Sequence, residues 1–118
     1  MMKALCISTG SDSNHNTWLT VNHEYLVLSI LALPEKAVLF RLMADDTRTP
    51  ILAESSLFAA VSQPLPSNWV AAVREGGAVE LGPRGWLDAG FWERFFDGEA
   101  EAEEIFRKES EAMNSENR

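Results

Sequence analysis

Residues 18–31 (WLTVNHEYLVLSIL) and 37–44 (AVLFRLMA) decide the fold. Both runs are rich in the aliphatic and aromatic residues that strands favour. The first run is apolar on both of its faces, which is typical of a strand that is buried centrally or bent between two sheets. In the second run, alternation places Arg41 on the face opposite Phe40 and Leu42. A turn at residues 34–36 joins the two runs, so they predict neighbouring antiparallel strands.

Further strands are predicted on both sides of this pair. Residues 3–8, 50–53 and 57–62 are short apolar runs bounded by turn residues. Together with residues 19–31 and 37–44, they predict one antiparallel sheet. Residues 69–73 and 78–81 predict a hairpin around Gly76–Gly77, where positive φ angles suit a tight turn. A short helix capped by Ser67 or Asn68 and ended by Gly76 is the alternative for this segment.

The chain after residue 82 has a helical pattern. Asp88 is the predicted cap of a helix over residues 89–96, in which Phe91, Phe95, Trp92 and Phe96 share an arc of about 140° at 100° per residue. A second helix is predicted from Asp97–Gly98 to about Met113. Its predicted inward positions are Ala102, Ile105, Phe106, Ala112 and Met113. Because Glu109 interrupts this apolar arc, we expect packing to be lost beyond about Lys108 and residues 114–118 to be disordered.

These elements predict the α+β class. The expected architecture is a small bent antiparallel sheet or partly open barrel with C-terminal helices packed on one side. A length of 118 residues with 46% hydrophobic content indicates one domain over residues 1–118, β-rich in residues 1–82 and helical in residues 83–113. The single cysteine and the absence of a signal-peptide pattern lead us to expect a cytoplasmic protein that does not enter a membrane.

The net charge of −8 is concentrated at one end of the sequence. Residues 88–118 hold ten acidic and four basic residues, a net charge of −6. Nucleic-acid binding requires clustered Lys and Arg, and the longest basic cluster is the pair Arg107–Lys108. We therefore expect no nucleic-acid partner. The acidic end instead predicts a basic protein as partner, although net charge also serves solubility alone.

No residue pattern in the sequence indicates an enzyme. His15 and His23 do not have the spacing of metal ligands, and Cys6 lies within an apolar strand, where cysteine is usually buried and inert. The neighbouring carboxylates Asp45–Asp46 are typical of a turn. The sequence therefore predicts no catalytic residue, no metal and no cofactor. It does not indicate an oligomeric state.

Aromatic residues are dense in the last third of the chain, and they predict a contact surface. Six of them lie between Trp69 and Phe96. Most large aromatics are buried, but an arc of 140° is wider than a helix needs to face a core, so some belong at its rim. Aromatics at a surface are frequent binding hot spots. The predicted partner-binding residues are Trp92, Phe96, Glu101, Glu103 and Glu104.

Two sets of residues each carry a resemblance to a known family. Residues 19–27 (LTVNHEYLV), residues 40–46 (FRLMADD) and the pair Leu57–Phe58 resemble a pattern of small bacterial and phage SH3-like β-barrel proteins, with Asn22 in place of the usual glycine. Residues 90–97 (GFWERFFD) are more weakly similar to the helical ends of bacterial immunity-type proteins. These resemblances imply a non-enzymatic protein-binding module, with an immunity or inhibitor role as its specific form. The alternative is an enzyme or small-ligand-binding protein with its site in the barrel mouth.

Overall fold

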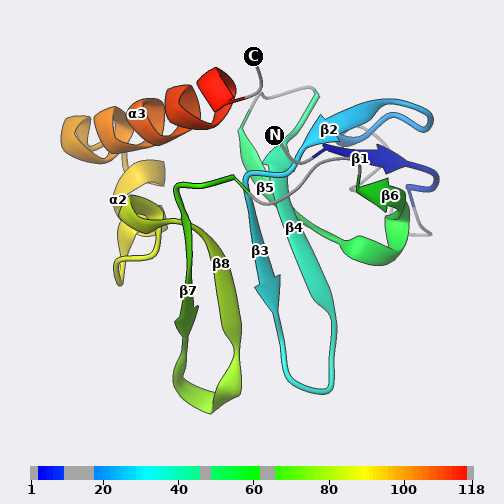
Figure 1. Cartoon of the computed structure of the whole chain (residues 1–118), viewed down its shortest axis with the longest axis horizontal. Coiled ribbons are helices and arrows are strands. Elements are labelled where there is room, and N and C mark those ends of the chain that lie inside the picture. The colour runs from blue at the N-terminus through cyan, green and yellow to red at the C-terminus, as the bar shows by residue number, and fades with distance from the viewer. Residues whose placement is uncertain (1–2, 10–17, 46–48, 62–65, 117–118) are drawn as a thin grey trace.

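The protein is an α+β structure with two antiparallel sheets and two C-terminal helices, which confirms the predicted class (Figure 1). The computed structural model describes residues 3–9, 18–45, 49–61 and 66–116. The strands are β1 (Lys3–Cys6), β2 (Glu24–Leu26), β3 (Ser29–Ala32), β4 (Val38–Met43), β5 (Pro50–Glu54), β6 (Phe58–Val61), β7 (Trp69–Val73) and β8 (Val79–Pro83). The helices are α2 (Phe91–Phe96) and α3 (Ala100–Glu116), and short 3-10 turns are η1 (Ser55–Leu57), η2 (Glu75–Gly77) and η3 (Arg84–Trp86).

The strands form two sheets, so the prediction of one sheet is wrong. The smaller sheet has the order β2-β1-β6, and the larger has the order β5-β4-β3-β8-β7. The physical reason lies in residues 19–31, where the strand breaks at Val27 and Leu28. Both of these residues are buried. The chain thus passes from one sheet to the other through the core, as the bent-strand interpretation predicted. Residues 19–23 form a turn rather than a strand, with Asn22 at a φ of 75°.

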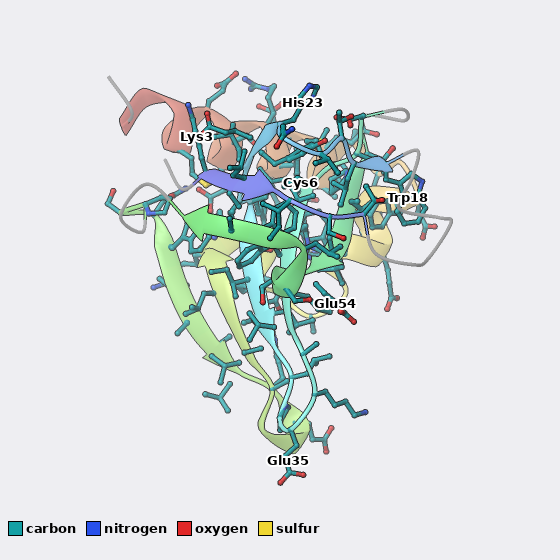
Figure 2. The ribbon with its side chains drawn as sticks, turned by 90° about the vertical axis from the view of Figure 1, so that its right-hand side faces the viewer. Lys3, Cys6, Trp18, His23, Glu35 and Glu54 are labelled. Atoms are coloured by element: carbon teal, nitrogen blue, oxygen red, sulfur yellow. The ribbon has the colours of Figure 1, made fainter. Side chains whose placement is uncertain are left out.

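The core between the sheets is built from alternating residues on facing strands. Phe40 and Leu42 of β4 point to the side of the smaller sheet, where Phe58 and Tyr25 pack against them. The rings of Phe40 and Phe58 lie 5.5 Å apart, and those of Tyr25 and Phe58 lie 6.3 Å apart. Figure 2 shows the smaller sheet in front of the larger one, with Cys6 on β1, the middle strand of the smaller sheet, and with the hairpin of the larger sheet that ends at Glu35 extending below it. The hairpin ends therefore project beyond the covered part of the large sheet.

The segment 69–83 is a hairpin, and the helix alternative is wrong. β7 and β8 pair antiparallel from Trp69 with Pro83 to Val73 with Val79. Gly76 and Gly77 have φ angles of 82° and 89°. Residues with a side chain seldom adopt such angles, so the glycine pair sets the place of the turn.

Helix α2 begins differently from the prediction. The residue before it is Gly90, with a φ of 77° and no side-chain cap, so Asp88 does not cap the helix. The backbone N–H of Phe91 instead donates to the carbonyl of Asp88 at 3.0 Å. A left-handed glycine turns the chain sharply into α2, which positions the aromatic residues against the sheet and α3.

Helix α3 stays packed as far as Met113, so the expected loss of packing after Lys108 is wrong. Glu109 attaches α3 to the rest of the fold. Its Oε2 accepts a hydrogen bond from the backbone N–H of Gly85 at 3.0 Å, and its backbone carbonyl accepts one from Asn68 Nδ2 at 3.3 Å. One turn later, buried Met113 accepts the indole N–H of Trp69 at 3.0 Å. The helix continues to residue 116, and residues 117–118 lie outside the described residues. Of the predicted inward positions, Ala112 is exposed.

Candidate functional site

The aromatic residues of α2 divide into buried and exposed members. Phe91 is 1% exposed and Phe96 is 52% exposed, while Trp92 and Phe95 are partly buried. Phe91 is thus the most deeply buried of the four, and Phe95 packs beside it with ring centroids 6.3 Å apart. Phe96, at the end of the short helix, touches Trp92 and Phe95 at ring distances of 6.1 and 5.4 Å. It presents an aromatic ring to solvent while its inner edge rests on the cluster.

Exposed carboxylates surround Phe96 in the chain. They belong to Glu93, Asp97, Glu99 and Glu103. They lie at the end of α2, in the turn at Gly98 and in the first turn of α3. The backbone N–H of Asp97 donates to the carbonyl of Glu93, and that of Glu103 to the carbonyl of Glu99, each at 3.0 Å, so the members of each pair are one helical turn apart. Within the described part of the chain, none of these four carboxylates has an ion-pair partner. We call Phe96 and these four residues the acidic–aromatic surface.

The predicted glutamates do not lie together as one group. Glu101 and Glu103 flank opposite sides of the exposed face of α3, about 160° apart at 100° per residue. Glu104 lies between them and binds Arg107, which also holds Glu111 at 2.7 Å. The hydrogen bond from Arg107 lowers the pKa of the Glu104 carboxyl below its usual value. Of the three, Glu103 therefore belongs to the acidic–aromatic surface, and the charge of Glu104 is largely neutralised.

Trp92 lies inside the aromatic cluster rather than at its rim. Its ring contacts Trp86 and Phe106, and its indole N–H is buried with no acceptor among the residues that the structure describes. The guanidinium carbon of Arg41 stands 3.9 Å above the Trp92 ring. Such a cation–π contact attaches α2 to the central strand β4. Trp92 thus holds the helix on the sheet, on the face opposite Phe40.

Arg41, which lies beside this aromatic cluster, is a buried cation. It is only 8% exposed, and within the described residues its side chain has no hydrogen bond or ion pair. Burial lowers the pKa of its guanidinium to about 10, and the charge of Glu80 offsets only part of this effect. Glu80 itself is bound at 3.0 Å by Arg74, which also donates to the carbonyl of Leu87. Alternation correctly predicted that Arg41 lies on the face of β4 opposite Phe40. No local pattern indicated that α2 would cover it.

Replacing Arg41 by methionine should keep or raise the free energy of unfolding, by up to about 2 kcal/mol at neutral pH, because a buried cation without an acceptor is costly. The folded-state pKa of about 10 lies below the ordinary pKa that the guanidinium has in an unfolded chain. The unfolded state therefore binds more protons in that window, and wild-type stability rises relative to the variant as pH increases through it. Urea unfolding of both proteins at neutral pH and at about pH 11 measures the difference in their free energies of unfolding, which should be smaller at the higher pH. A loss above about 2 kcal/mol at neutral pH would mean that Arg41 has an acceptor in solution.

A cavity lies where the two sheets meet. Residues 23–26, 28 and 43–45 line a cavity of about 300 Å³ that is open to solvent. On its wall, Asp45 accepts hydrogen bonds from the Tyr25 hydroxyl at 2.7 Å and from Thr20 Oγ1 at 2.6 Å. Burial and the hydrogen bond to Asp45 raise the pKa of Tyr25. Asp45 thus ties the turn before β2 to the end of β4, a structural role in keeping with the predicted turn.

The other residues considered in the sequence analysis are the cysteine, the two histidines and Asp46. Cys6 is fully buried and unpaired, as predicted, and burial raises the pKa of its thiol. His23 is exposed at the cavity edge, while His15 and Asp46 lie outside the described residues. Across the residues that the structure describes, no group of three or more His, Cys, Asp or Glu is arranged to hold a metal ion. In that same part of the chain, no helix combines the length and apolarity that a membrane span needs.

Comparison with known proteins gives no relative. No family model, no curated protein and no solved structure matches this chain. The acidic–aromatic surface and the cavity between the sheets are therefore interpreted from their own geometry.

Proposed function

We propose that the protein is a non-enzymatic binding module whose acidic–aromatic surface docks a basic protein, with an immunity or inhibitor role as the specific form. The observation that carries this proposal is the half-exposed Phe96 among carboxylates that lack ion-pair partners within the described residues. An aromatic anchor with a polar rim is the usual composition of a binding hot spot. Unpaired carboxylates around it favour Lys and Arg on the partner.

The placement of the negative charge also supports a basic partner. Residues 91–116, which comprise the two helices and the turn between them, hold nine acidic and three basic residues, a net charge of −6. Both helices lie on the same side of the large sheet, away from the smaller sheet (Figure 1). A partner approaching from that side meets the strongest negative field of the molecule. Glu101 and Glu103 contribute to this field from exposed positions on α3. Complementary charge raises the rate and specificity of encounter, and Phe96 supplies the apolar contact.

Affinity capture with matched baits tests the proposal. Wild-type protein should retain a basic protein from an extract of the organism that encodes it, and Phe96→Ser should lose that protein. Because Phe96 is half exposed, this change should cost less than about 1 kcal/mol of stability, which thermal unfolding can verify. Glu75→Ser, at the tip of the β7–β8 hairpin, is the control and should retain the partner. Retention of the same protein by Phe96→Ser would remove the acidic–aromatic surface from the proposal.

The alternative is an enzyme or small-ligand binder that uses the cavity between the sheets. The observation in its favour is the open cavity of about 300 Å³, a size at the lower limit of small-molecule sites, with Tyr25 and Asp45 on its wall. A ligand bound there would be lost by blocking the cavity, for example with Met43→Trp, which enlarges an exposed side chain of the lining, and kept by Phe96→Ser. The two functions thus respond to different substitutions.

A further inference from the structure

Strand β7 is an outer strand of the large sheet and carries no charged residue. Its sequence is Trp-Val-Ala-Ala-Val, and β8 is its neighbour in the sheet. Val73 is 76% exposed, and Ala71 is exposed as well. Outer strands expose backbone groups that can pair with another strand. The backbone N–H and C=O groups of β7 that do not bond to β8 are the ones available for such pairing.

The register of the hairpin identifies these groups. The N–H of Arg74 donates to the carbonyl of Ala78 at 2.6 Å. Since hydrogen-bonded and non-hydrogen-bonded pairs alternate along an antiparallel ladder, Val70 and Ala72 also bond to β8. Ala71 and Val73 therefore direct their N–H and C=O groups away from β8. Among the described residues, nothing bonds to these groups.

The opposite edge of the same sheet is protected. The N–H of Ala44 donates to the carbonyl of Thr49 at 2.9 Å, so the outward positions of β5 are Pro50, Leu52 and Glu54. Pro50 has no N–H to offer, and Glu54 adds a charge. Both features discourage pairing with a further strand. β7 has neither, although it is equally long.

We propose that β7 pairs with β7 of a second copy of this chain, antiparallel and about a two-fold axis at Ala71. The two Ala71 residues then exchange N–H···O bonds, and each Val73 N–H donates to the carbonyl of Trp69 in the other copy. These four bonds join the two large sheets into one. A two-fold axis is the common symmetry of homodimers, and it requires a self-complementary strand. The small side chain on the axis and the exposed Val73 beside Trp69 meet this requirement.

Charge complementarity favours a second copy over an unrelated strand. In this register Arg74 of one copy lies beside Asn68 of the other. The Nδ2 atom of Asn68 binds the carboxylate of Glu109 at 3.4 Å. The side chain of Arg74 keeps 35% exposure while it binds Glu80. A cation of one copy therefore lies near the Glu109 carboxylate of the other at both ends of the paired strands.

The pairing is independent of the proposed function, and salt distinguishes the two. Each copy carries a charge of −8, so two copies repel each other at long range. Added salt screens this repulsion and should strengthen the dimer. The same salt weakens the attraction between the acidic–aromatic surface and a basic partner. Failure of one proposal thus leaves the other untouched.

Sedimentation velocity over a micromolar to millimolar series, at low and high salt, tests the dimer. Val73→Lys should raise the dissociation constant at least about tenfold, since it places charge in the paired strands. Val38→Lys is the matched control, because Val38 is 42% exposed on the same face of an inner strand, and it should leave the constant unchanged. Ala71→Pro should also prevent pairing, because it removes an N–H that points outward and spares the bonds to β8. Circular dichroism checks that each variant folds.

Amide hydrogen exchange in the wild-type protein gives a second measurement without any substitution. The amides of Ala71 and Val73 should become protected as concentration rises, while exposed amides at the hairpin tips stay unprotected. A monomer at every concentration would overturn the proposal and leave β7 open to an extended strand of another protein. A dimer that survives both Val73→Lys and Ala71→Pro would equally overturn it, because its contact would lie elsewhere.

Discussion

Replacing Phe91 by alanine is expected to lower the free energy of unfolding by about 3–5 kcal/mol, a large part of the stability of a small domain. The ring is 1% exposed and contacts Trp92 at 5.0 Å and Phe95 at 6.3 Å. Its removal leaves a cavity that the surrounding rings, held by α3 and the sheet, fill only in part. The midpoint of urea unfolding, followed by tryptophan fluorescence and circular dichroism, measures the loss.

Phe96→Ala is the matched control for this change. It removes the same ring from the same helix, but from a half-exposed position. The expected loss is below about 1 kcal/mol, because most of the ring is in water in both states. Equal losses for the two variants would show that α2 is rotated in solution relative to the arrangement described above. A loss below about 1 kcal/mol for Phe91→Ala would show that α2 does not dock through this residue.

The strands were the most predictable part of the fold, because their alternation is local. β4 and the β7–β8 hairpin lie within two residues of the predicted bounds, and Gly76–Gly77 forms the turn. The division into two sheets was not predictable in this way. Residues 26–28 are apolar whether the strand continues or bends, and only pairing with distant strands decides between the two. Periodicity does not report pairing partners.

Glu109 shows why the helical part was harder to predict. In a helical wheel, a carboxylate within an apolar arc indicates lost packing, because the wheel contains only one helix. In the fold, the N–H of Gly85 comes from η3 and the amide of Asn68 from the residue before β7. Together they satisfy the carboxylate, so its burial is not penalised. These donors are 24 and 41 residues away in the chain, and no local pattern relates them to Glu109.

The candidate site was predictable in kind but not in detail. The wide aromatic arc correctly indicated a rim residue, and Phe96 is half exposed there. Trp92 could not be separated from Phe96 by sequence, because its position depends on Arg41, half a chain away in a strand. Likewise, the counting of charges could not show that Arg107 neutralises Glu104. Charge counts describe the field at long range, and contacts decide which carboxylates remain available.

Association with the basic partner is expected to slow sharply as salt rises, by about tenfold or more between 0.01 M and 0.1 M, because the Debye length falls from about 30 Å to about 10 Å. Reversing Glu101, Glu103 and Glu104 to Lys should slow association at low salt, since all three are exposed on α3. The sharper variant is Asp97→Lys with Glu103→Lys, which acts on the acidic–aromatic surface and leaves the Glu104–Arg107 pair intact. Stopped-flow mixing with the captured partner measures these rates.

The control for this prediction carries the same change in net charge at a distant place. Glu35→Lys with Glu75→Lys alters the tips of the two long hairpins, far from α2 and α3 (Figures 1 and 2). If steering depends on where the charge lies, this control should keep most of the wild-type rate, whereas the Asp97 and Glu103 reversal should lose it. Equal slowing by both variants would mean that net charge alone governs encounter. A rate that does not depend on salt would mean that the acidic end of the chain serves solubility and not partner recognition.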